Sequence, residues 1–96
     1  MAKQAYRELV KTALRNDFAV SVWDGEEWQV KRSQCLKDIV EAVKSVEEAT
    51  LRFYDKNGDK QGSALVSAYG LEPEETVIDT SLTPWIEAFD ESYYNF

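Results

Sequence analysis

The sequence predicts a single α+β domain in which helices pack on one face of an antiparallel sheet of about four strands. Apolar residues recur at helical spacing in two segments. Each segment is followed by two short stretches of alternating apolar and polar residues around a Gly-containing turn. A chain of 96 residues has room for one core, so residues 1–96 are expected to form one domain with the order α-ββ-α-ββ-α.

The first helix is expected at residues 3–15, and a hairpin that turns at Asp24-Gly25 is expected at residues 18–32. Ser33 is the expected N-cap of the second helix, because a hydroxyl there would accept a hydrogen bond from the first turn. Two sets of residues give the helices their apolar faces. They are Tyr6, Leu9, Val10, Ala13 and Leu14 in the first helix, and Leu36, Ile39, Val40, Val43 and Val46 in the second.

A second hairpin is expected from a strand at 50–54, a turn at 55–62 and a returning strand at 63–69. The order helix–strand–strand therefore occurs twice. A shift of 31 residues places Trp23-Asp24 on Tyr54-Asp55. An internal repeat explains this likeness, and so does the spacing that all amphipathic helices share.

The chain changes character after Gly70. Residues 71–75 are expected to form an acidic loop, and residues 76–79 a short edge strand. Thr83-Pro84 is a helix-start signal, with Thr as the N-cap and Pro at the first helical position.

The negative charge of the chain lies in its last third. The formal net charge is −7, with 11 basic and 18 acidic residues. All the basic residues lie within residues 1–60, where an equal number of acidic residues balances them. The segment 61–96 has seven carboxylates and no Lys or Arg, so it alone provides the excess. A segment of one sign attracts a basic partner, although a merely solvated acidic end has the same composition.

The composition argues against catalysis, metal binding and cofactors. Without histidine, and with Cys35 as the single cysteine, the chain has no Ser–His or Cys–His pair and no Cys/His zinc site. Asp55, Asn57 and Asp59 have the spacing of calcium ligands, but Lys60 occupies the position that a calcium loop gives to glycine. We therefore expect a hairpin turn there, no metal, no cofactor and no enzyme.

A basic stripe runs along the first helix, where Lys3, Arg7, Lys11 and Arg15 recur every four residues. Such a stripe is either a solvated face, partly balanced by Glu8, or a phosphate-binding surface. Because nucleic-acid-binding domains are usually basic overall, we expect no direct binding of nucleic acid.

The last helix and the acidic residues before it form the candidate binding site. Trp85, Phe89 and Tyr93 lie on one helix face, where they either close the core or partly remain exposed as anchors. The predicted partner-binding residues are the acids of this segment and the aromatic residues at the chain end. They are Glu72, Glu74, Glu75, Asp79, Glu87, Asp90, Glu91, Tyr93, Tyr94 and Phe96.

The chain resembles the small acidic accessory proteins encoded by phages and prophages, including anti-CRISPR and other anti-defence inhibitors. The Trp23-Asp24-Gly25 turn, the compact helix–hairpin order and the segment 61–96 without basic residues carry this resemblance. It implies a protein without enzymatic activity that binds a larger host protein. Some proteins of that group use clustered carboxylates to occupy a surface meant for nucleic-acid phosphates.

The expected function is thus an acidic protein-interaction module, a phage-type inhibitor that binds the Lys/Arg-rich surface of a larger protein. The alternatives are a nucleic-acid-associated protein that uses the basic stripe, and a small self-assembling virion protein. We expect a cytoplasmic protein, in the host if a phage encodes it. No apolar run approaches the ~18 residues of a membrane span, so no membrane partner is expected. A homodimer is left open.

Overall fold

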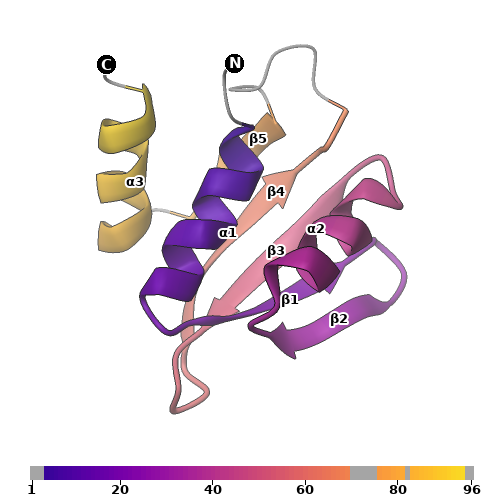
Figure 1. The fold of residues 1–96 in the computed structure, drawn as a ribbon, viewed down its shortest axis with the longest axis horizontal. Coiled ribbons are helices and arrows are strands. Elements are labelled where there is room, and N and C mark those ends of the chain that lie inside the picture. Colours follow the sequence, from indigo (N-terminus) through magenta and orange to yellow (C-terminus); the bar gives the residue numbers. More distant parts are fainter. Residues whose placement is uncertain (1–3, 70–75, 82, 95–96) are drawn as a thin grey trace.

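The computed structural model describes residues 4–69, 76–81 and 83–94, with three helices and five strands (Figure 1). The fold is α+β, as predicted. The elements are α1 Ala5–Arg15, β1 Ala19–Trp23, β2 Trp28–Ser33, α2 Leu36–Lys44, β3 Ala49–Tyr54, β4 Lys60–Val66, β5 Val77–Thr80 and α3 Pro84–Tyr94.

The five strands form one antiparallel sheet in the order β2-β1-β3-β4-β5. The sequence predicts about four strands and a short edge strand at 76–79. The structure has that strand as β5, paired to β4 through Leu65 and Asp79. The sheet therefore ends in β2 on one side and β5 on the other.

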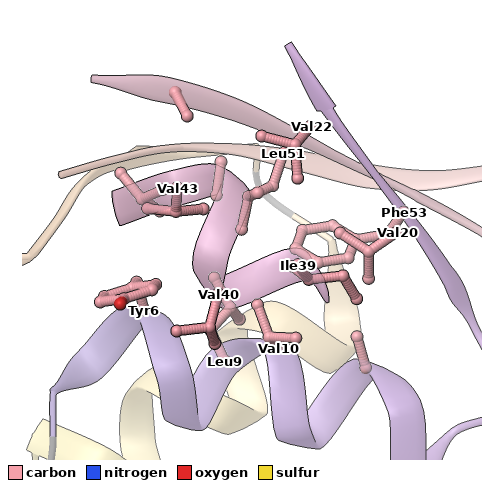
Figure 2. Packing of buried hydrophobic residues seen from close by; sticks show 14 of the residues in the cluster. Tyr6, Leu9, Val10, Val20, Val22, Ile39, Val40, Val43, Leu51 and Phe53 are labelled. Carbon is pink, nitrogen blue, oxygen red and sulfur yellow. The ribbon is translucent and has the colours of Figure 1, made fainter. Parts of the chain in front are cut away.

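All three helices lie on the same face of the sheet. α1 and α2 cross this face side by side, and α3 stands next to α1 (Figure 1). Inward-pointing strand residues such as Val20, Leu51 and Phe53 alternate with residues on the other face, so one face is apolar and buried. Tyr6 and Leu9 of α1 pack there with residues of α2 (Figure 2). No described helix covers the opposite face of the sheet.

The two helix–hairpin units are arranged about an approximate two-fold axis between β1 and β3. In the β1–β3 ladder the central pair is Ser21 and Arg52, which are 31 residues apart. The shift suggested by the sequence equates these two residues. Each inner strand also pairs with its own hairpin partner on its outer side. The units are therefore alike in arrangement as well as in element order.

An aspartate side chain stabilises the turn of each hairpin. Asp24 Oδ1 accepts hydrogen bonds from the N–H groups of Glu26 and Glu27, at 2.7 and 2.8 Å. Asp55 Oδ1 accepts from Asn57 and Asp59 at 2.9 and 3.0 Å. Each carboxylate stabilises its turn by accepting hydrogen bonds from backbone N–H groups that follow it in the sequence.

The predicted side-chain caps of two helices are not formed. Ser33 is the last residue of β2, and its hydroxyl accepts the N–H of Cys35, which takes the N-cap position of α2 without a side-chain cap. Pro84 is the first residue of α3, as predicted. The Thr83 hydroxyl, however, is buried and has no hydrogen-bond partner among the described residues. Tertiary packing of the apolar faces, rather than capping, positions these two helices.

Candidate functional site

Five of the predicted partner-binding residues lie in the described part of the chain. Asp79 is on β5, and α3 carries Glu87, Asp90, Glu91 and Tyr93. The remaining predicted residues lie outside the described residues, with only the backbone of Tyr94 described as part of α3. They are Glu72, Glu74, Glu75, Phe96 and the side chain of Tyr94.

The structure brings β5 and α3 together around a shallow depression of about 220 Å³. It is lined by residues 77–80 of β5 and by Asp90 of α3. Asp79 is exposed at its rim, and Ile78 is 50% exposed beside it. Glu87 and Glu91 are exposed on the same helix as Asp90. We call Asp79, Glu87, Asp90 and Glu91 the acidic edge.

The orientation of α3 follows from its buried residues. Ile86 and Phe89 are buried against the sheet and α1, and this turns Glu87 and Glu91 toward solvent. Trp85 fixes the first turn, since its indole N–H donates to the carbonyl oxygen of Gln61 at 2.6 Å. The ring of Trp85 also makes edge contacts with Phe18 and Phe53.

Tyr93 is partly committed to the core. It is half-buried and stacked on Phe89, with ring centroids 5.5 Å apart. The sequence placed the apolar anchor of the site among the aromatic residues at the chain end. Among the described residues, Ile78 is a half-exposed apolar side chain at the acidic edge, and the sequence pattern did not indicate it. The signal that could have found it was its place in a predicted edge strand.

Asp90 is the carboxylate of the acidic edge whose pKa is shifted by its surroundings. Burial raises the pKa of Asp90 above its ordinary value, and the negative charge of Glu87 raises it further. Among the described residues, no Lys or Arg forms an ion pair with any carboxylate of this edge. The edge therefore carries negative charge that the described cations do not neutralise by contact.

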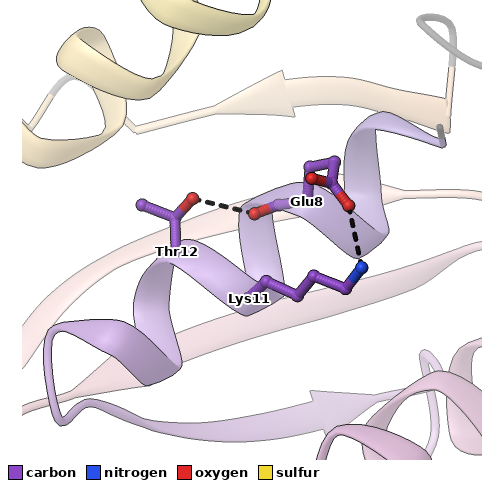
Figure 3. Close-up of polar contacts among 3 residues, drawn as sticks. All are labelled: Glu8, Lys11 and Thr12. Carbon is purple, nitrogen blue, oxygen red and sulfur yellow. Dashed lines mark hydrogen bonds and ion pairs between the residues drawn. The ribbon is translucent and has the colours of Figure 1, made fainter. Parts of the chain in front are cut away.

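The basic stripe of α1 is not joined to the acidic edge by ion pairs between described residues. Lys11 Nζ pairs instead with Glu8 of its own helix at 3.1 Å (Figure 3). The Thr12 hydroxyl bonds to the carbonyl oxygen of Glu8 in the same turn. Arg7 and Arg15 are exposed, and Lys3 lies outside the described residues. The stripe is thus partly balanced within α1, as the sequence suggested for Glu8.

At one position on the outer edge of β5, the backbone N–H that a further strand would need already has a partner. The N–H of Ser81 bonds to the carbonyl of Ser63, so the N–H of the preceding Thr80 points away from β4. Asp79 Oδ1 accepts that N–H at 2.9 Å. A charged residue that caps an outward N–H makes strand addition unfavourable. A partner at this edge would therefore contact side chains.

The other chemical groups singled out in the sequence lie apart from this edge. Asp55 and Asp59 belong to the β3–β4 turn, and Cys35 is exposed at the start of α2. Within the described ranges, no three metal-ligating side chains come close enough together to hold an ion.

Comparison with protein-family models, with curated proteins and with solved structures gives no significant match. None of the helices in the described ranges has the length and apolar character needed to cross a membrane.

Proposed function

We propose that this protein is a non-enzymatic interaction module whose acidic edge binds a Lys/Arg-rich surface of a larger protein. One observation carries the proposal: half-exposed Ile78 lies in the same depression as Asp79 and Asp90. An apolar side chain ringed by charges is the usual composition of a protein interface, where the apolar group gives affinity and the charges give orientation.

The charge distribution supports a basic partner. The segment 61–96 contains no cation, so the elements that carry the acidic edge contribute only negative side chains to it. The ionised form of Asp90 carries a penalty in the folded state, because burial and then the charge of Glu87 raise its pKa. A cation from a partner would remove this penalty. Binding there would block a nucleic-acid-binding protein by occupying the groove that receives phosphates.

The same features support stoichiometric binding rather than catalysis. The acidic edge lies at a shallow and open surface, where three of its four carboxylates are exposed and water is not excluded from a bound group. We also propose a cytoplasmic location, because a reducing compartment suits the exposed thiol of Cys35.

The test compares two triple charge reversals of equal size. One is D79K/E87K/E91K at the acidic edge, and the other is E26K/E47K/E48K at exposed positions elsewhere. Both change the net charge from −7 to −1, since three substitutions add six charges. The probe is a fluorescein-labelled Lys/Arg-rich peptide, measured by anisotropy at low and high salt.

We expect the edge variant to bind at least about tenfold more weakly than the wild type, mainly through slower association. The remote variant should lose less than about threefold, as expected for a general charge effect. Equal losses in both variants would mean that overall charge alone attracts the peptide, and would refute the acidic edge as a site. Circular dichroism of both variants checks that they fold.

Capture of partners from the native host extends the test. A protein retained at low salt and released at high salt should bind the remote variant and not the edge variant. Retention of the same protein by both would again contradict the proposal.

A further inference from the structure

The sheet face opposite the helices carries two arginines that lie against aromatic rings. Arg52 of β3 places its guanidinium carbon 5.1 Å from the ring centre of Trp28 on β2. Arg32 of β2 places its guanidinium carbon 4.5 Å from the ring centre of Tyr54 on β3. Each arginine therefore reaches across β1, the strand between them.

The strand register puts these side chains on one surface. Arg52 pairs with Ser21 and Tyr54 pairs with Ala19, and these positions alternate with the buried Val20 and Val22. Trp23 belongs to the same surface and makes an edge contact with Trp28, its cross-strand partner, at 4.9 Å. We call Trp23, Trp28, Arg32, Arg52 and Tyr54 the arginine–aromatic face.

Local backbone features place Arg32 on this face. The β1–β2 register shifts between Val20 and Val22, so Lys31 and Arg32 both lie opposite Ser21. Arg32 has φ +48°, and its N–H donates to the Ser21 hydroxyl at 2.8 Å. A bulge that holds a charged side chain at a defined position is a common feature of binding surfaces.

The guanidinium groups keep their N–H edges available. In the part of the chain that the structure describes, neither Arg32 nor Arg52 forms an ion pair or a side-chain hydrogen bond. The aspartates of the two hairpin turns, Asp24 and Asp55, accept hydrogen bonds from backbone N–H groups and glutamine side chains instead. A guanidinium held over a ring presents a preorganised set of donors for phosphate.

From this geometry we propose that the arginine–aromatic face binds single-stranded nucleic acid. Arg32, Arg52 and the exposed Lys31 supply local positive charge for phosphates, although the whole chain is acidic. Trp23, and the guanidinium groups that lie over Trp28 and Tyr54, supply stacking surfaces for bases, which are accessible only in an unpaired strand. The rings span three adjacent strands, about 10 Å, a width suited to two or three bases.

This inference departs from the expectation that the chain binds no nucleic acid. That expectation rested on net charge, which averages over the surface. In the structure the arginines lie on β2 and β3, whereas Glu87, Asp90 and Glu91 lie on α3, and Asp79 lies on β5 at the far edge of the same sheet. The inference is independent of the acidic edge, because it uses none of the residues of that edge.

The test measures anisotropy of a fluorescein-labelled oligothymidylate of about twelve nucleotides at about 50 mM salt. The variants are Arg32→Ala/Arg52→Ala on the sheet face and Arg7→Ala/Arg15→Ala on α1. All four arginines are exposed, and both variants lose two positive charges. The second pair is therefore a matched control, and it also tests the basic stripe of α1.

We expect the wild type to bind the single strand and a matching duplex to bind more weakly. The sheet-face variant should lose at least about tenfold in affinity and the α1 variant less than about threefold. Arg32→Lys/Arg52→Lys keeps the positive charge but not the planar donor set, so it should show an intermediate loss of affinity. This variant replaces the alanine variant in the comparison if the alanine variant does not fold.

Three outcomes would overturn the proposal. The first is no binding by the folded wild type at this salt concentration. The second is an equal loss in both alanine variants, which would indicate attraction by charge alone. The third is displacement of the oligonucleotide by an equimolar poly-glutamate peptide, which would make an acidic polypeptide the occupant of this face.

Discussion

The Thr76 hydroxyl oxygen accepts a hydrogen bond from the backbone N–H of Tyr6 at 3.0 Å, across 70 residues of sequence. Tyr6 lies in the first turn of α1, where backbone N–H groups have no partner within the helix. Gln4 occupies the N-cap position and makes no side-chain cap. Thr76 therefore supplies a cap from a distant part of the chain, and it ties α1 to the start of β5.

Replacing Thr76 with valine tests this cap. Valine keeps the shape but removes the acceptor, and both Thr76 and Tyr6 are buried. The N–H of Tyr6 would lose its protein acceptor, so we expect a loss of about 1–3 kcal/mol in the free energy of unfolding. Thr76→Ser keeps the hydroxyl and should lose less. Urea denaturation measures both, and a greater loss in the serine variant would show that packing of the methyl group dominates.

Gly62 allows α3 to approach the sheet. It has φ +128°, and a Cβ built there would lie 2.9 Å from Ser81 Oγ and 3.0 Å from Ile86 Cδ1. Gly25 also has a positive φ, +105°, but a Cβ there would meet nothing within 4 Å. Both alanine variants incur backbone strain, and only Gly62→Ala adds a clash.

We therefore expect Gly62→Ala to lose about 1–3 kcal/mol more stability than Gly25→Ala. Thermal or urea unfolding of the two variants gives the difference directly. Equal stabilities would mean that the first turn of α3 moves aside without cost.

Local patterns predicted most of the fold. Alternation placed Val20 and Val22 on one face of β1 and Ser21 and Trp23 on the other, and helical spacing identified the inward faces of α1 and α2. The predicted N-caps were less accurate, because capping depends on the local backbone path. Ile86 was also missed, although it shares a helical face with Phe89 and Tyr93.

The surfaces of the molecule could be predicted only in part. The sequence located the acidic segment, because a lack of cations is visible in one dimension. It did not pair Arg52 with Trp28, or Arg32 with Tyr54, because these contacts depend on strand order and on a bulge. Neither property follows from residue spacing along a single strand.

The aspartates of the two hairpin turns predict a loss of stability in acid. Bonds from backbone N–H groups, led by those of Glu27 to Asp24 and of Asp59 to Asp55, lower the pKa of both carboxyls below 3.8. A lowered pKa stabilises the folded state above the unfolded pKa, and this contribution disappears as the pH falls through the folded value. We expect Asp24→Asn/Asp55→Asn to unfold at a lower urea concentration than the wild type at pH 7.

This difference should shrink as the pH falls below about 4. The control is Glu47→Gln/Glu48→Gln, which removes two exposed charges outside the turns. A difference that stays constant down to low pH would show that the carboxylate charge plays no part in holding the turns.

The contribution of Asp90 to stability should depend on pH in the opposite direction. Burial, followed by the charge of Glu87, raises its pKa above 3.8 in the folded state. Between 3.8 and the raised value the folded state binds more protons than the unfolded state, so stability falls as the pH rises through this window. Asp90→Asn removes the penalty and should be more stable than the wild type at pH 7, with no such gain below about pH 3.8.

Glu91→Gln, on an exposed position of the same helix, is the control. If Asp90→Asn is more stable and also binds the basic peptide more weakly, the charge at this position costs stability and serves binding. A destabilised Asp90→Asn at pH 7 would mean that the carboxylate holds α3 in place.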